Sequence, residues 1–207
     1  MVTSLPNLLT FSRIAVIPIL VALFWIDGNA ARWVACALFA AAGVTDYLDG
    51  YLARTLREQS QLGTLLDPIA DKLLVATTLF LLAAFGRIQG INLLPAILIL
   101  CREILVSGLR EYLAGVNVGV PVTKLAKWKT TIQMVAIGFL IVGSAGDVLV
   151  PHALEIGVVG LWIAAVLTLV TGYDYLREGF KHIDVADARA KAKRGKGDVK
   201  GAKPANP

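Results

Sequence analysis

Cysteine and histidine are scarce in this sequence, with two residues of each among 207. Cys36 and Cys101 each lie within an apolar run, so we expect packed thiols and neither a disulfide framework nor a zinc site. Charged residues are also few: they make up 17% of the chain, against 57% hydrophobic residues, whereas an average soluble domain has about 25% charged residues. This composition argues against a soluble domain and predicts a polytopic membrane protein with an all-α fold.

The excess of positive charge is confined to the C-terminal end. The net charge of the chain is +5, but residues 1–180 hold as many basic as acidic residues. Residues 181–207 hold eight basic and three acidic ones. We therefore expect a membrane domain at 1–180 and a basic, disordered cytoplasmic tail at 181–207 that is attracted to anionic membrane lipid. No nucleic-acid partner is expected.

Six apolar segments are candidates to cross a bilayer, which takes about 20 residues of helix. They lie near residues 14–26, 31–52, 64–85, 91–113, 125–145 and 154–176. The amphipathic stretch 4–13 is expected to lie along the membrane interface, and no cleavage site of small residues follows the first span, so we expect an uncleaved segment. We expect Pro68 in the first turns of the third span, where its missing N–H breaks few helical bonds.

Basic residues are distributed unequally between the two sides that six spans define. The N-terminal segment, the connections near 53–60 and 113–124, and the tail share one side, and their flanks hold eight Lys and Arg residues. The opposite connections hold only Arg32 and Arg87. By the positive-inside rule the basic side is cytoplasmic. We expect a multi-pass protein of the cell inner (cytoplasmic) membrane with both termini in the cytoplasm.

Four aspartates lie inside or at the edge of the second and third predicted spans: Asp46, Asp49, Asp67 and Asp71. A charged side chain at the centre of a membrane helix costs roughly 2.5 to 3.5 kcal/mol on insertion scales, so four together need a compensating partner. Spacings of three and four residues place each pair on one helix face, and two adjacent helices would bring the four carboxylates together. Hard oxygen ligands without cysteine or histidine favour Mg²⁺, Mn²⁺ or Ca²⁺ over zinc, and two such ions would neutralise the cluster.

Between the two pairs lie small residues and a guanidinium suited to a phosphate: Gly50, Ala53, Arg54, Ser60 and Gly63. Small side chains allow close approach of a ligand, and arginine can bind two phosphate oxygens at once. The segment therefore predicts phosphoryl chemistry at a membrane surface. Because the connection near 53–60 is expected on the cytoplasmic side, we expect the site to face the cytoplasm.

The spacing of these residues resembles a known family signature. The order is Asp46, two residues, Asp49-Gly50, two residues, Ala53-Arg54, eight residues, Gly63, three residues, Asp67, three residues, Asp71. This order is similar, at every fixed position, to the signature of the CDP-alcohol phosphatidyltransferase family, and the resemblance covers residues from about Pro6 to Arg177.

The resemblance implies an enzyme that transfers a phosphatidyl group from CDP-diacylglycerol to an alcohol in phospholipid biosynthesis. It implies two divalent cations, Mg²⁺ or Mn²⁺, held by the four aspartates, with Asp71 also acting as the catalytic base, and it implies a homodimer. The positions that match the family's CDP-diacylglycerol-binding residues are Asn7, Thr10, Gly50, Ala53, Arg54 and Ser60.

A second group of basic residues lies toward the cytoplasmic ends of the fourth and fifth predicted spans: Arg102, Arg110, Lys124, Lys127 and Lys129. Together they could hold an anionic substrate, although topology alone also places Lys and Arg at cytoplasmic helix ends. The strings around them resemble the bacterial branch of the family that makes phosphatidylglycerophosphate, with Ala126 in place of that branch's common glycine. The resemblance implies that these five residues bind the phosphate of sn-glycerol 3-phosphate.

Other acceptors and one other class of protein stay open at this point. A phosphatidylserine, phosphatidylinositol-phosphate or cardiolipin synthase would keep the aspartates and change the acceptor, and the basic group favours a phosphorylated acceptor over serine. A transporter would also bury carboxylates, but it predicts broken helices in corresponding halves of an internal repeat, and the sequence has no such repeat.

Overall fold

The computed structural model describes the backbone of residues 5–56, 61–115 and 124–201, and side chains within 10–45, 66–115 and 125–179, except those of Asp67 and Ala126. Every regular element in these ranges is a helix, and none is a strand. The elements are α1 (Leu5–Phe24), α2 (Asn29–Leu56), α3 (Gln61–Ala84), η1 (Gly90–Asn92), α4 (Leu93–Gly115), α5 (Lys124–Val142), η2 (Gly143–Val148) and α6 (Ala153–Gly201). The predicted all-α fold is therefore confirmed for the described residues.

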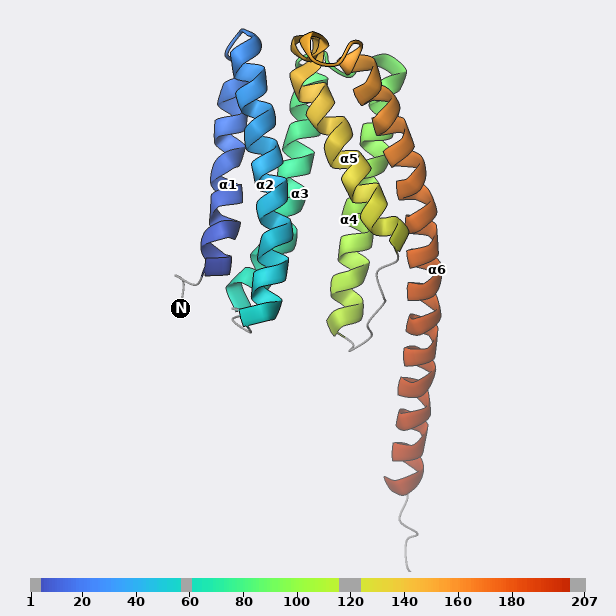
Figure 1. The fold of residues 1–207 in the computed structure, drawn as a ribbon. Helices are drawn as coiled ribbons and strands as arrows, with labels where there is room; N and C mark the ends of the chain where they lie inside the picture. The colour runs from blue at the N-terminus through green and yellow to red at the C-terminus, as the bar shows by residue number, and fades with distance from the viewer. Residues whose placement is uncertain (1–4, 57–60, 116–123, 202–207) are drawn as a thin grey trace, which may run out of the picture.

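The six α-helices run alternately up and down in a bundle (Figure 1). α1 packs against α2 and α3, α2 also packs against α5, and α6 packs against α4 and α5. The α1–α2 connection, η1 and η2 lie at one end of the bundle, which we call the η end. The ends of α2 and α4 and the beginnings of α3 and α5 lie at the other end, which we call the site end.

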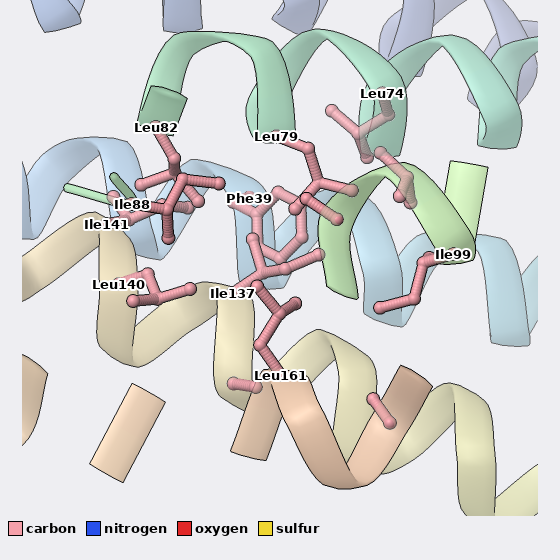
Figure 2. Packing of buried hydrophobic residues seen from close by; sticks show 14 of the residues in the cluster. Phe39, Leu74, Leu79, Leu82, Ile88, Ile99, Ile137, Leu140, Ile141 and Leu161 are labelled. Atoms are coloured by element: carbon pink, nitrogen blue, oxygen red, sulfur yellow. The ribbon is translucent and has the colours of Figure 1, made fainter. Parts of the chain in front are cut away.

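Large apolar side chains from all six α-helices form the core of the bundle, and Figure 2 shows part of this cluster. The ring of Phe39 in α2 is 1% exposed and lies among Leu79 of α3, Ile137 of α5 and their neighbours. Burying a side chain of this kind stabilises a protein in water by roughly 1.5 to 3 kcal/mol. Between helices in a bilayer the stabilisation comes mainly from van der Waals packing. This core fixes the helix positions on which the site end depends.

Small residues bring α5 and α6 close together. A Cβ atom at Gly157 would lie 3.0 Å from the backbone nitrogen of Leu140, and one at Gly160 would lie 2.9 Å from the Cβ of Ala136. Close backbone approach of this kind gives helices in a bilayer their dispersion contacts, because lipid removes most of the hydrophobic drive for association.

Three segments of the described chain are long and apolar enough to cross a membrane: Gly90–Gly115, Lys127–Val148 and Ala153–Gly179. Thr10–Phe24 forms a shorter apolar helix. These segments are consistent with a membrane protein. The predicted spans in α2 and α3 include residues whose side chains lie outside the described set, so the total of six spans stays a prediction.

The structure differs from the sequence-based expectations in three places. Residues 5–13 are the first turns of α1 and form no separate interfacial element. α3 begins at Gln61, so Pro68 lies about two turns inside the helix and cannot donate to the carbonyl four residues earlier. Cys36 is half-buried and donates to the carbonyl of Gly138 at 3.6 Å, whereas Cys101 is exposed on the bundle surface and is not a packed thiol.

The predicted C-terminal tail begins within α6, and its disorder stays a prediction. α6 continues as one helix to Gly201 and extends beyond the rest of the bundle at the site end (Figure 1). Alanine, lysine and arginine dominate residues 186–194 and are among the strongest helix formers, while the first glycine after Gly179 is Gly195. The division between a membrane domain at 1–180 and a tail at 181–207 stays a prediction.

Candidate active site

The two aspartate pairs lie on continuous helix in α2 and α3. Asp46 and Asp49 are ten and seven residues before the last residue of α2, and Asp67 and Asp71 are six and ten residues after the first residue of α3. At a rise of 1.5 Å per residue, Asp46 and Asp71 both lie about 15 Å along the axis from these helix ends, and Asp49 and Asp67 lie about 9 to 10 Å along it. Counted from these helix ends, the two pairs lie at similar positions along consecutive helices.

Asp71 is the member of this group whose side chain the structure describes. Its side chain is 42% exposed, and one carboxylate oxygen lies 3.6 Å from Nζ of Lys72. The side chains of Asp46, Asp49 and Asp67 lie outside the described set, and no cluster of three or more carboxylate, histidine or cysteine side chains occurs within that set. The metal site therefore stays a prediction that rests on helix register and ligand chemistry.

Glu103 of α4 is the centre of an ion-pair network near Asp71. One of its oxygens lies 3.4 Å from Nζ of Lys72 in α3. The other accepts from Nζ of Lys129 in α5 and lies 3.4 Å from a guanidinium nitrogen of Arg102. One carboxylate thus joins α3, α4 and α5, and Lys72 is shared between Glu103 and Asp71.

Lys129 is 3% exposed, so its ammonium is almost completely removed from solvent. An ammonium in such a place needs a counter-charge with good hydrogen-bonding geometry, because desolvating an unpaired ion costs several kcal/mol. Glu103 supplies that charge. The pair therefore keeps a fixed cation inside the bundle at the site end.

Arg102 connects the same network to α6. Its guanidinium donates to Oγ1 of Thr171 at 3.2 Å, and Thr171 in turn donates to the carbonyl of Leu167 at 2.7 Å. The stem of Arg102 crosses α6 at Gly172, where a Cβ atom would lie 2.9 Å from its Cγ. Glycine at this position lets the arginine pass between the helices.

A cavity of about 460 Å³ opens beside this network. Asp71, Lys72, Glu103, Lys129 and Gln133 give it its polar lining, and the rest of its wall is largely apolar. Gln133 is 2% exposed, and its Oε1 has no hydrogen-bond partner among the described residues. A buried amide oxygen without a partner costs about 1 to 3 kcal/mol, which a ligand hydroxyl or ammonium could offset.

Four of the five basic residues expected to bind the acceptor phosphate have described side chains, and these lie in different surroundings. Lys129 lines the cavity, and Arg102 is joined to it through Glu103. Arg110 is exposed and its guanidinium carbon lies 5.9 Å from the ring centre of Tyr175 in α6, a cation–π contact. Lys127 is exposed and the side chain of Lys124 lies outside the described set.

Little of the expected nucleotide site falls on described side chains. Thr10 is 1% exposed and has an interaction partner. The side chains of the others lie outside the described set: Asn7, Gly50, Ala53, Arg54 and Ser60. Their assignment to CDP-diacylglycerol stays a prediction.

Sequence reasoning missed Lys72, Glu103 and Gln133. Each had a signal in the sequence. Glu103 is a carboxylate within a predicted span, which is a functional candidate by default. Lys72 directly follows Asp71, and Gln133 lies four residues after Lys129, so both belong to the same helix faces or turns as residues already singled out.

The fold is an all-helical bundle whose long apolar helices are consistent with a membrane protein, and charged side chains that include Asp71 line a cavity at its site end. The model of the family described as CDP-alcohol phosphatidyltransferase matches residues 3–170. This match covers more than half of the chain, so the protein belongs to the CDP-alcohol phosphatidyltransferase family.

Two curated relatives match over nearly their whole lengths, and a third matches over a little more than half of its length. A protein of Rickettsia typhi named CDP-diacylglycerol--glycerol-3-phosphate 3-phosphatidyltransferase is 47% identical over 174 residues, which cover 84% of this chain and 96% of the relative. A protein of the same name from Cereibacter sphaeroides is 38% identical, with 87% and 97% covered. A cardiolipin synthase (CMP-forming) of Oryza sativa subsp. japonica is 38% identical, with 84% of this chain and 57% of the relative covered.

The network around Glu103 gives a test of what holds the site end together. Glu103→Gln removes the counter-charge of Lys129, Lys72 and Arg102 while keeping the side-chain shape. We expect it to lower the free energy of unfolding by about 3 to 5 kcal/mol, the cost of leaving a buried ion without its partner. Glu111→Gln, an exposed change on the same helix, is the matched control and should change stability by about 0.5 kcal/mol or less.

Unfolding of the detergent-purified variants, followed by circular dichroism, measures these differences. The double variant Glu103→Gln/Lys129→Gln should recover part of the lost stability, because the buried ammonium of Lys129 is then absent as well. The effects of the two changes should therefore be non-additive. Equal stability of Glu103→Gln and Glu111→Gln would contradict the role given to the network.

Proposed function

We propose that this protein transfers the phosphatidyl group of CDP-diacylglycerol to sn-glycerol 3-phosphate, forming phosphatidylglycerophosphate and releasing CMP. The observation that carries the proposal is the match over 84% of the chain, at 47% identity, to a relative named for this reaction. The cavity beside Asp71 supports it, because its fixed cations and unpartnered amide oxygen suit a small anionic polyol. The protein is accordingly an enzyme of phospholipid biosynthesis.

The four aspartates suit a pair of divalent cations, Mg²⁺ or Mn²⁺. All the proposed donors are hard carboxylate oxygens, and the two pairs lie at similar positions along α2 and α3. Asp71 has the ammonium of Lys72 beside it, which partly balances its charge. When bound, the ions would neutralise the pyrophosphate of the liponucleotide and stabilise CMP as the leaving group.

Asp71 is proposed to have a second role as the base. Its side chain is partly exposed and faces the cavity in which we place the acceptor, so its carboxylate could take the proton of the attacking hydroxyl. The oxygen of the acceptor then forms a bond to the phosphorus attached to diacylglycerol, and the bond from that phosphorus to CMP breaks. Lys72 keeps Asp71 in position through one ion pair and contacts Glu103 through another.

The acceptor is proposed to lie between Lys129 and Gln133, one turn apart on α5. Lys129 would attract the phosphate, and Oε1 of Gln133 would accept a hydrogen bond from a glycerol hydroxyl. Arg110 and Lys127 are exposed at the same end of the bundle and would draw the anion toward the cavity. CDP-diacylglycerol is proposed to bind near Asn7, Thr10, Gly50, Ala53, Arg54 and Ser60.

We propose six membrane-spanning helices, with the site end and both termini on the cytoplasmic side of the inner membrane, and a homodimeric assembly. The alternating direction of the helices supports an even number of spans (Figure 1). The basic residues near the site end support its cytoplasmic position. A charged headgroup could then reach the site from the inner leaflet without crossing hydrocarbon.

One relative supports a second candidate acceptor. The Oryza protein is named a cardiolipin synthase (CMP-forming) and is 38% identical over 189 residues, so phosphatidylglycerol could replace glycerol 3-phosphate as the acceptor in the same chemistry. The buried cation Lys129 favours the more highly charged phosphate monoester. An acceptor comparison separates the two candidates.

The first test concerns the aspartates. Asp→Asn at position 46, 49, 67 or 71 removes one negative charge with little change of shape, so we expect CMP release to fall by at least about 10²-fold in each variant. The measurement is CMP released by detergent-purified protein with CDP-diacylglycerol, glycerol 3-phosphate and Mg²⁺. Full activity of Asp71→Asn would exclude Asp71 as the base, and full activity of the other three would exclude the metal site.

The second test concerns the acceptor. Wild-type protein should release CMP faster with glycerol 3-phosphate than with serine, inositol, inositol phosphate or phosphatidylglycerol. Lys127→Gln should raise KM for glycerol 3-phosphate several-fold and leave KM for CDP-diacylglycerol unchanged, because the loss of one attracting charge affects only the soluble anion. Arg177→Gln, an exposed cation of α6, is the control and should change neither KM. Preference for serine or free inositol would exclude an acceptor phosphate.

The third test concerns topology. Single cysteines placed at positions 57 and 124 in a variant without Cys36 and Cys101 should react with a membrane-impermeant reagent from the cytoplasmic side of sealed vesicles. Cysteines at Asn29, Gln89 and Asp147 should react only from the opposite side. Labelling of positions 57 and 147 from the same side would rule out the six-span arrangement.

A further inference from the structure

Two arginines line one pocket at the η end, far along the bundle from Asp71. The pocket has a volume of about 200 Å³, roughly seven times the 30 Å³ that one water molecule takes in the liquid. Arg32 comes from the first turns of α2 and Arg87 from the connection between α3 and η1. Phe24, Phe85 and Asp27 also line it. These two arginines are the only basic residues in the connections on their side of the predicted membrane. The positive-inside rule does not explain them, because it places Lys and Arg on the opposite, cytoplasmic side.

Both guanidiniums are held in place. Arg87 donates to the carbonyls of Leu140 and Ile141 near the end of α5, at 3.5 and 3.2 Å. Gly143, with φ of +54°, leaves room for it, since a Cβ there would collide with the guanidinium. Arg32 donates to Oγ of Ser144 at 2.9 Å. Their positions are therefore set by α5 and η2 before any ligand arrives.

Neither guanidinium has an ion-pair partner among the described residues. Asp27 lies at the same pocket and is exposed, but it forms no ion pair with either arginine. Burial, and after it the charge of Arg32, lowers the pKa of Arg87 from its usual value. The two guanidiniums repel one another and have N–H donors that no described residue uses. A bound anion would reduce this repulsion and accept from these donors.

Aromatic side chains at the pocket indicate where it lies in the membrane. Phe85 packs edge to face against Trp25 and Phe24, with ring centres 5.0 and 5.5 Å apart. Trp25 is 68% exposed. Exposed tryptophan beside apolar rings is typical of the level of the lipid headgroups, so the anion within reach of this pocket is the phosphate of a lipid.

We propose that the Arg32–Arg87 pocket binds the phosphodiester of an anionic phospholipid in the leaflet at the η end. The two guanidiniums would bind its oxygens, and Phe24, Phe85 and Trp25 would pack against the glycerol and the first methylenes. The site is separate from the proposed active site. A lipid there would hold the α1–α2 connection, the α3–η1 connection and η2 together.

The test is the thermal unfolding midpoint of full-length protein in a neutral detergent, titrated with phosphatidylglycerol, with phosphatidylcholine, or with inorganic phosphate. Phosphatidylglycerol should raise the midpoint more than phosphatidylcholine, and inorganic phosphate should have little effect. Arg32→Gln should raise the phosphatidylglycerol concentration for half of the shift about tenfold, because one charge-assisted contact is lost. Asp27→Asn should lower that concentration, because it removes a negative charge from the pocket.

Ser144→Ala is the matched control, since it removes the hydrogen bond that holds Arg32 but no charge, and it should raise the phosphatidylglycerol concentration for half of the shift by no more than about threefold. Arg87 is tested by Arg87→Lys and not by Arg87→Gln. The lysine keeps a positive charge beside the α5 carbonyls, whereas the glutamine variant could fail to fold. CMP release by Arg32→Gln should equal that of wild type, which separates this proposal from the proposed reaction.

Equal titrations of wild type and Arg32→Gln with phosphatidylglycerol would overturn the proposal and leave the arginines a structural role alone. An equal shift with phosphatidylcholine would overturn the preference for an anionic lipid. If inorganic phosphate shifted the midpoint as much as phosphatidylglycerol does, the proposal that the ligand is a lipid would be wrong.

Discussion

A carboxylate inside an apolar helix bundle is stable only beside opposite charge, because the cost of removing it from water exceeds what apolar packing returns. In this protein the constraint decides how the helices meet at the site end. Glu103 contacts Lys72 from α3 and Lys129 from α5, and it is paired with Arg102, which reaches α6 through Thr171. Four helices are thereby tied to one carboxylate, and three of them, α3, α4 and α5, line the cavity beside Asp71.

The same constraint relates the structure to the proposed chemistry. Lys72 is shared between Glu103 and Asp71, so the cation network and the aspartate group are in contact. The cavity at this junction has a fixed cation and a carboxylate on its wall, which would suit the proposed acceptor with its phosphate and its hydroxyl. Substrate binding and proton transfer would thus depend on one set of ion pairs between helices.

Much of the fold could be predicted from the sequence, because apolar runs of membrane length are a strong local signal. The expected span 91–113 corresponds to α4 (Leu93–Gly115), and the aspartate pairs lie on α2 and α3 as expected. The continuation of α6 to Gly201 was not predicted, although the alanine, lysine and arginine residues there favour a helix. The pairing of Glu103 was missed because it depends on which faces of three helices meet, and this information is not local.

The basic residues illustrate the same limit. Lys127 and Lys129 are two residues apart, which turns them about 200° from one another on a helix. They therefore cannot both face the cavity, and the structure buries Lys129 and exposes Lys127. A list of neighbouring cations predicted a single cluster, whereas helix geometry divides it between an inner cation and an outer rim.

The central claim is that two divalent cations bind between the aspartate pairs of α2 and α3. Electron paramagnetic resonance of full-length protein with Mn²⁺ and CDP-diacylglycerol tests it most directly. The account predicts two Mn²⁺ per chain with the exchange-coupled spectrum of ions about 3.5 to 4 Å apart, and loss of that spectrum in Asp49→Asn. A single uncoupled Mn²⁺ per chain, or a coupled pair that persists in Asp49→Asn, would contradict it.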